Sequence, residues 1–217
     1  MLKLADNPDT DYKALVRRGY DRCAADYAGQ RQDTVPPKLS LLIERLPRGA
    51  AVLDIGCGAG VPVCRELAKI ANVTGVDLSP MMISLARVNV PSARFILADI
   101  MCAEFPAASL DAVTSFYAIF HLPKTEHEEL FRRVYRWLKP GGQFLTTLSL
   151  QDEEPYTEDH FFGGTMYWSN YGLAQYREKL HNLGFTIEED TQIGSGYGKP
   201  VGRDDEVHPL IFARKAR

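Results

Sequence analysis

Short apolar runs alternate with helical patterns through the middle of the chain. The runs at residues 51–55, 73–77, 94–99, 110–116 and 143–148 are too short for helices, and each predicts a buried strand. Between these runs, apolar residues recur at helical spacing. Strands that alternate with helices form a parallel sheet with right-handed crossovers. The pattern therefore predicts an α/β fold.

Local sequence signals predict where several helices begin and end. Pro62 suits the first position of one helix, and Asn72 is expected to close it. Ser79 before Pro80 predicts the N-cap of the next helix. A further helix is expected to start with a capping box of Thr125 and Glu128. It should end at the turn Pro140-Gly141-Gly142. Its buried apolar face is expected to consist of Leu130, Phe131, Val134, Trp137 and Leu138.

The two ends of the chain differ from its middle. Residues 1–37 are polar and carry tyrosines, which predicts a helical cap. A helix is expected over 171–183, closed by Gly184, and strands over 185–191 and 209–215 predict a hairpin at one sheet edge. Residues 1–217 are expected to form one domain, in which residues 151–170 are an insert.

Composition narrows the possible partners. The 217 residues are 45% hydrophobic and 24% charged, with a formal net charge of −3 and no Lys/Arg-rich run, so nucleic acid and anionic membranes are not expected partners. No signal-peptide or membrane-spanning apolar stretch is seen. The four cysteines show no metal or disulfide spacing, so no metal is expected, and a reducing cytoplasm is the expected location.

The segment Asp54-Ile55-Gly56-Cys57-Gly58-Ala59-Gly60 lies where the first strand of the middle region turns into a helix. Glycines let the backbone approach a ligand closely, and a helix N-terminus offers N–H groups to an anion. The spacing differs from the G-x-G-x-x-G of dinucleotide-binding turns. Taken alone, the glycines could equally serve a tight turn without a ligand.

Acidic and aromatic residues at the ends of the next strands favour a binding site. Asp77 ends the second strand, where a carboxylate can accept both hydroxyls of a ribose, and Asp99 ends the third, where it can accept the amine of an adenine. Phe116 and Tyr117 end the fourth. Ligands of open α/β sheets bind at the carboxyl ends of the strands. Each acid could singly be a cap or a solvated turn, but together they predict one adenosyl site.

These motifs resemble the series found in class I S-adenosylmethionine (SAM)-dependent methyltransferases. The similarity runs from about Lys38 to Leu148, and its style is that of the small-molecule branch that includes ubiquinone and menaquinone biosynthesis methyltransferases. The matching segments are Val52 to Gly60, Gly75-Val76-Asp77 with Leu78-Ser79-Pro80, Leu97-Ala98-Asp99, Leu138-Lys139-Pro140-Gly141-Gly142, and Gly184-Phe185 near the end.

The resemblance implies a Rossmann-like sheet of seven mostly parallel strands, the last one antiparallel, with helices on both faces. It implies SAM as the cofactor and residues 1–37 as a lid that carries Tyr20 and Tyr27. Acidic and aromatic groups also suit the cationic sulfonium. The candidate cofactor contacts are Tyr20, Tyr27, Asp54, Gly56, Cys57, Gly58, Asp77, Leu78, Met82, Asp99, Ile100, Phe116 and Tyr117.

The expected reaction is methyl transfer to an O, N, S or C nucleophile of a small molecule, which leaves S-adenosylhomocysteine. Positioning contributes most of the catalysis, and a general base is optional. His121, just past the fourth strand, is the candidate base, although a purely structural role is the alternative; His160 is a weaker candidate. The oligomeric state is left open.

The insert is unusually aromatic from Phe161 to Trp168. It could form the acceptor wall or a hydrophobic plug that holds the lid. In the first case His121, Met166 and Trp168 are the expected acceptor contacts. The acidic residues of the insert are expected to form a solvated run, with contact to a cationic acceptor as the alternative; they are Asp152, Glu153, Glu154, Glu158 and Asp159.

Four other functions are weighed against this interpretation. A nicotinamide-dependent oxidoreductase would share the Gly-rich turn, but the glycine spacing and Lys139-Pro140-Gly141-Gly142 fit it poorly. A SAM-binding module without transferase activity and a methyltransferase of protein side chains remain alternatives. Nucleic-acid methylation is disfavoured, because Ser115-Phe116-Tyr117-Ala118 lacks the Asn/Asp-Pro-Pro-aromatic pattern and no Pro-Cys pair occurs.

Overall fold

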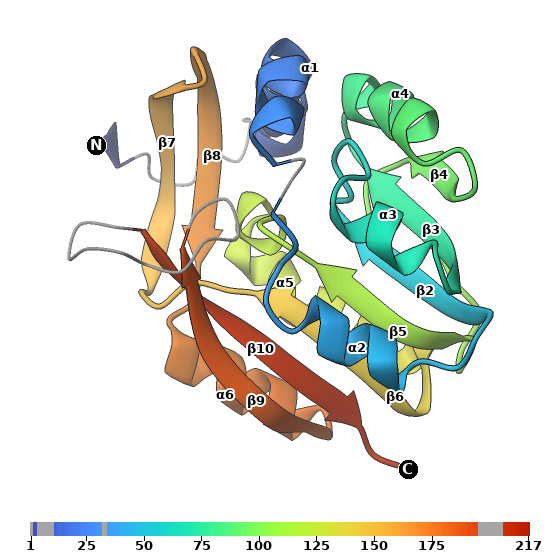
Figure 1. Cartoon of the computed structure of the whole chain (residues 1–217). Coiled ribbons are helices and arrows are strands. Elements are labelled where there is room, and N and C mark those ends of the chain that lie inside the picture. The colour runs from blue at the N-terminus through green and yellow to red at the C-terminus, as the bar shows by residue number, and fades with distance from the viewer. Residues whose placement is uncertain (1, 4–10, 32–33, 195–205) are drawn as a thin grey trace.

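A seven-stranded sheet forms the centre of the computed structural model, which describes residues 2–3, 11–31, 34–194 and 206–217 (Figure 1). The strand order is β4-β3-β2-β5-β6-β10-β9. Strands β2 to β6 run parallel, whereas β10 is antiparallel to both β6 and β9. The expected sheet with an antiparallel last strand is confirmed. The strands are β2 (Ala50–Ile55), β3 (Ala71–Asp77), β4 (Arg94–Leu97), β5 (Leu110–Ser115), β6 (Leu138–Thr147), β9 (Phe185–Gly194) and β10 (Val207–Lys215).

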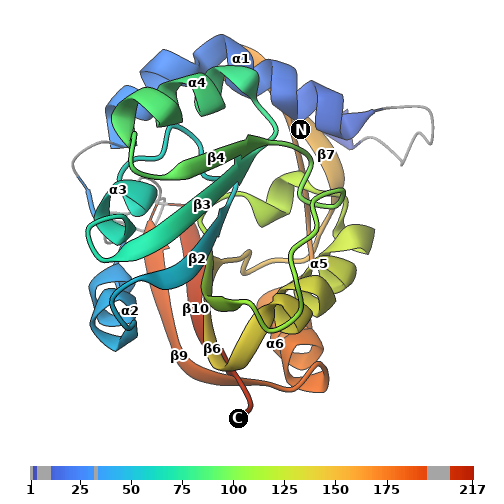
Figure 2. The ribbon, with the colours of Figure 1, turned by 90° about the vertical axis from the view of Figure 1, so that its right-hand side faces the viewer.

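Helices cover both faces of this sheet (Figure 2). Side chains alternate between faces along a strand. Val52 therefore packs into the core under α2, α3 and α4, while the adjacent Leu53 packs into the core under α5 and α6. The helices are α2 (Leu39–Arg45), α3 (Val63–Leu67), α4 (Pro80–Asn89), α5 (Lys124–Trp137) and α6 (Leu173–Asn182).

A long N-terminal helix and a second, three-stranded sheet lie beside the main sheet. The helix α1 (Tyr12–Arg31) runs between β8 and α4 (Figures 1 and 2). It packs Val16 against Met166 and Tyr167, and it packs Ala24 and Ala28 against Met82. The second sheet has the order β1-β7-β8 and consists of β1 (Leu2–Lys3), β7 (Glu153–Phe161) and β8 (Gly164–Asn170).

The insert is therefore a β-hairpin and not an irregular connection. Phe162 and Gly163, with φ of 46° and 78°, form the two-residue turn between β7 and β8. Two consecutive residues with positive φ match the right-handed twist of the strands that they join. The hairpin holds one side of α1 above the main sheet.

Several expected helix boundaries are wrong because tertiary contacts override local signals. Helix α5 begins at Lys124, whose backbone N–H donates to Ser169 Oγ on β8 at 3.0 Å. Thr125 therefore lies inside the helix, and it forms no capping box with Glu128. Asn72 lies in β3, and not at the end of a helix. Leu138 already begins β6, ahead of the Pro-Gly-Gly turn. The Ser79 cap is confirmed, since its Oγ accepts the Met82 N–H at 3.1 Å.

None of the helices formed by the described residues has both the length and the apolar character needed to cross a membrane.

Candidate functional site

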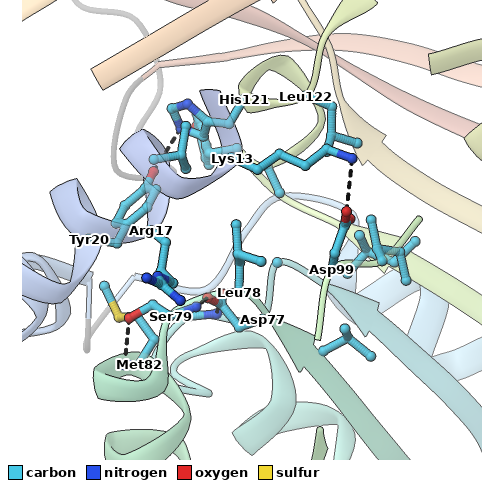
Figure 3. Close-up of a pocket in the computed structure, with 18 of the residues that line it drawn as sticks. Lys13, Arg17, Tyr20, Asp77, Leu78, Ser79, Met82, Asp99, His121 and Leu122 are labelled. Atoms are coloured by element: carbon cyan, nitrogen blue, oxygen red, sulfur yellow. Dashed lines mark hydrogen bonds and ion pairs between the residues drawn. The ribbon is translucent and has the colours of Figure 1, made fainter. Parts of the chain in front are cut away.

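A cavity lies beneath α1 at the carboxyl ends of the parallel strands, where the strand order reverses between β2 and β5 (Figure 3). The space among its lining atoms, open solvent included, is about 800 Å³. Ligands of open α/β sheets bind at this position, at the carboxyl ends of the strands beside the point where the strand order reverses. Its wall includes twelve of the candidate residues: Tyr20, Tyr27, Gly56, Gly58, Asp77, Leu78, Met82, Asp99, Ile100, Phe116, Tyr117 and His121.

The Gly-rich turn after β2 forms the floor of this cavity. Gly56 has a φ of 66°, and a Cβ at this position would lie 2.2 Å from the Cβ of Ala118. Gly58, with a φ of 52°, would place a Cβ in open space. Only glycine adopts both conformations without strain, and at Gly56 only glycine also leaves room for the next strand end.

Asp77 connects this turn to the end of β3. Its Oδ2 accepts the Gly58 N–H at 2.8 Å, and its Oδ1 accepts the Ser79 N–H at 2.9 Å. Burial raises the pKa of the Asp77 carboxyl, although the backbone N–H donors oppose that effect. A carboxylate has about four acceptor positions, so Asp77 can hold the turn and still accept hydroxyl groups from the cavity.

Asp99 is held by a lysine that the sequence did not suggest. Its Oδ2 lies 2.8 Å from Lys13 Nζ on α1 (Figure 3). Lys13 Nζ also lies 2.7 Å from Glu126 Oε2 on α5. Burial alone would lower the pKa of the Lys13 ammonium, but the hydrogen bonds to Asp99 and Glu126 raise it. Lys13 and Arg17 both line the cavity, so α1 supplies cations as well as tyrosines.

His121 forms a hydrogen-bonded pair with Tyr20 across the cavity (Figure 3). His121 Nδ1 is 2.8 Å from the Tyr167 carbonyl oxygen, and His121 Nε2 is 2.8 Å from the Tyr20 hydroxyl oxygen. A carbonyl can only accept, so Nδ1 carries the hydrogen and the lone pair of Nε2 accepts the Tyr20 O–H. The Tyr20–His121 pair can therefore take up a proton at Nε2.

Four candidate residues do not line the cavity. Asp54 lies on the same face of β2 as Val52, where Thr114 Oγ1 and Cys64 Sγ donate to it at 2.6 and 3.2 Å. Cys57 is buried against Gly75. Met166 is covered by α1, and Trp168 stacks on Tyr156 with its ring centroid 5.5 Å from that of His121. Asp54 and Cys57 thus support the turn from below, and Trp168 lies beside His121, which does line the cavity.

Asp54 and His127 give stability a pH dependence of opposite sign. Burial raises the pKa of Asp54 to about 6, against a usual 3.8, so between these values the folded protein holds a proton that the unfolded chain releases. Burial lowers the pKa of His127 to about 4, against a usual 6.5, so in this window only the unfolded chain is protonated. Asp54 therefore adds unfolding free energy as the pH falls from about 6 to 3.8. His127 removes unfolding free energy as the pH falls from 6.5 to about 4.

We expect the variant His127→Gln to lose less unfolding free energy than the wild type on acidification from pH 6.5 to 4, and Asp54→Asn to lose more. Each difference should be roughly 1–3 kcal/mol. Urea unfolding at several pH values measures it. His181→Gln, on the exposed face of α6, is the control. Profiles of both variants that run parallel to the wild type would contradict this assignment.

Comparisons with known proteins agree with the geometry of the cavity. Residues 52–142 match the family model of a methyltransferase domain. The ubiquinone biosynthesis O-methyltransferase of Pseudomonas aeruginosa is 32% identical over 146 residues, which are 64% of this chain and 61% of that protein. Phosphoethanolamine N-methyltransferase 1 of Arabidopsis thaliana is 34% identical over 155 residues, 67% of this chain and 31% of that protein. The chain thus spans less than two thirds of the length of these curated relatives.

A solved structure extends the likeness in fold to the whole chain. The 1,6-didemethyltoxoflavin-N1-methyltransferase of Burkholderia thailandensis, with bound 1,6-didemethyltoxoflavin and S-adenosylhomocysteine, has a TM-score of 0.72 at 20% identity. The match covers 100% of this chain and 93% of that one. At this identity the likeness concerns the fold alone.

Proposed function

We propose that this chain, which has the fold and the methyltransferase domain of the class I SAM-dependent methyltransferases, transfers the methyl group of SAM to a small-molecule acceptor. The observation that carries this proposal is the convergence of three features on one cavity. These features are the Gly-rich turn, the two carboxylates Asp77 and Asp99, and the Tyr20–His121 pair.

The residues of the cavity suit an adenosyl sulfonium. Asp77 accepts the two ribose hydroxyls, Asp99 accepts the adenine amine, and the open space at Gly58 lets a ligand approach the backbone of the turn. Backbone N–H groups at such a turn favour a carboxylate. Bound there, SAM supplies a methyl group on a positively charged sulfur, which leaves as the thioether when the acceptor attacks.

The protein's own part in the reaction is positioning and proton removal. The nucleophile forms its bond to carbon as the carbon–sulfur bond breaks, and the sulfur keeps the electron pair. A proton released by an O–H or N–H acceptor passes to the Tyr20 oxygen while the Tyr20 proton moves to His121 Nε2. The hydrogen bond from Nδ1 to Tyr167 keeps Nε2 available for this step.

Several observations support a small acceptor in the cytoplasm. Helix α1 roofs the cavity and is itself packed against β8, which favours a small ligand over a polymer. The relatives named for ubiquinone biosynthesis and for phosphoethanolamine methylation point the same way. The net charge of −3 disfavours nucleic acid, and the four thiols are all unpaired in the structure, which suits a reducing compartment.

Two measurements test the function. Calorimetry with S-adenosylhomocysteine and with NADH decides the cofactor, and binding of NADH alone would exclude the proposal. Incubation with methyl-labelled SAM and a fractionated cell extract decides the acceptor. Label in a low-mass compound supports the proposal. Label in protein or RNA would show that the acceptor is a macromolecule and not a small molecule. Binding of S-adenosylhomocysteine without transfer of label to any fraction favours a SAM-binding module without transferase activity.

We expect Asp77→Ala to weaken S-adenosylhomocysteine binding by about 1.5–3 kcal/mol, because it removes the acceptor of the ribose hydroxyls and the anchor of the Gly58 N–H. Calorimetry measures the change. Asp111→Ala is the matched control, since Asp111 also accepts a backbone N–H, from Ala51 at 2.8 Å, but lies outside the cavity wall. Equal affinities of Asp77→Ala and the wild type would rule out the ribose assignment.

A further inference from the structure

Arg133 on α5 turns its guanidinium toward the loop that follows Asp99. Its side chain is 8% exposed, and the guanidinium lies 5.2 Å from the centroid of the Trp137 ring. It donates to the carbonyl oxygens of Met101, of Ala103 at 2.5 Å and of Ile100 at 3.4 Å, and it pairs with Glu104 Oε1 at 2.7 Å. One buried cation thus binds three carbonyl oxygens of a single loop and a carboxylate.

The same loop carries the carboxylate and part of the wall of the proposed adenine site. Ile100 lines the cavity, and Asp99 Oδ1 accepts the Met101 N–H at 2.9 Å. The Ile100 carbonyl and the Met101 N–H belong to one planar peptide unit. Arg133 donates to the carbonyl oxygen of that unit, while the N–H of the same unit donates to Asp99 Oδ1. The position of the Asp99 carboxylate is therefore coupled to Arg133 through a rigid group.

We propose that Arg133 is a positioning residue for the adenine end of the cofactor, so that it determines how well Asp99 distinguishes an amine from other groups at that point of the ring. This inference rests on the proposed function. Arg133 itself does not line the cavity, so its effect passes through the loop. Such an effect is expected, because an acceptor displaced by a fraction of an ångström makes a weaker hydrogen bond.

The chemistry of the site favours arginine over lysine. A guanidinium has five N–H donors in a fixed plane and can serve several acceptors at different angles, whereas an ammonium is a single point with three donors. The four acceptors around Arg133 come from residues 100, 101, 103 and 104. A lysine at this position would satisfy only part of them.

The test compares two ligands that differ at the adenine amine. S-Inosylhomocysteine carries a carbonyl where S-adenosylhomocysteine carries the amine, so the ratio of their dissociation constants reports the Asp99 contact. Calorimetry gives this ratio for the wild type, Arg133→Met and Arg133→Lys. The matched control is Arg132→Met, because Arg132 is the adjacent arginine of α5 but is 54% exposed and pairs with Glu128 and Glu129.

We expect Arg133→Met to bind S-adenosylhomocysteine about tenfold more weakly and to lose a similar factor in the preference for it. Arg133→Lys should keep an intermediate preference, and Arg132→Met should keep that of the wild type. The lysine variant supplies the comparison if the methionine variant does not fold. A merely structural role would lower the melting temperature and leave the ratio unchanged.

Two failures are distinguishable. A wild type that prefers S-adenosylhomocysteine, with the same preference in both Arg133 variants, would overturn the role of Arg133 and leave the proposed function intact. A wild type that binds neither ligand would overturn the proposed function and this inference with it.

Discussion

The variant His121→Ala should lower the turnover number about 10²–10⁴-fold while its affinity for S-adenosylhomocysteine stays near that of the wild type. The reason is geometric. Nε2 is the one ring nitrogen of His121 with a lone pair, and it faces the Tyr20 hydroxyl at 2.8 Å. Removing the ring leaves the adenosyl contacts of Asp77 and Asp99 in place but removes the proton acceptor. Single-turnover kinetics and calorimetry separate the two quantities.

Four companion measurements sharpen this prediction. Added imidazole should restore part of the rate of His121→Ala, and His160→Ala, exposed on β7, should leave the rate unchanged. If Tyr20 relays the proton, Tyr20→Phe should lose nearly as much activity as His121→Ala. The double variant should then lose no more than either single one, because the two groups act as a unit. A fully active His121→Ala would show that His121 only packs α1 against β8.

Gly56→Ala should lose roughly 2–5 kcal/mol of unfolding free energy, from the left-handed conformation and the overpacking that the added methyl causes. The φ of 66° strains any residue with a Cβ, and the new atom would lie 2.2 Å from the Cβ of Ala118. Both strand ends at the switch point would have to move apart. Urea unfolding measures the loss, which is a large share of the stability of an ordinary domain.

Gly58→Ala is the matched variant for this position. Its φ of 52° brings a similar conformational strain, but its Cβ would meet no atom within 4 Å. We expect it to lose only about 1–2 kcal/mol of stability and to weaken ligand binding instead, because the added methyl takes up space beside the cavity. Equal stability losses in the two variants would contradict the steric contact with Ala118.

The main sheet could be predicted because its signals are local. Apolar runs, a Gly-rich turn and Asp77 and Asp99 after consecutive strands all follow from short stretches of sequence. Parallel strands end at the same edge of a sheet, so Asp77 and Asp99, which are 22 residues apart along the chain, were expected to lie at one site. The structure brings these groups to one cavity.

The roof of the cavity could not be predicted in the same way. Lys13 reaches Asp99 across 86 residues, and that contact depends on how α1 is rotated above the sheet, which no local pattern specifies. The β7–β8 hairpin carried a weak signal in Phe162-Gly163, an apolar segment interrupted by a glycine turn. The burial of Asp54 was open to inference, because period-two alternation places it with Val52, on the face that α3 covers.

The place of β10 in the main sheet has a consequence for the order of folding. This strand is the last of the sheet in sequence, yet it pairs on one side with β6 and on the other with β9. Until residues 207–215 leave the ribosome, β6 and β9 each present an unpaired edge, and edges of that kind recruit strands from other chains. A nascent chain that stalls before Val207 would therefore be a target for chaperones, and the completed strand closes both edges at once.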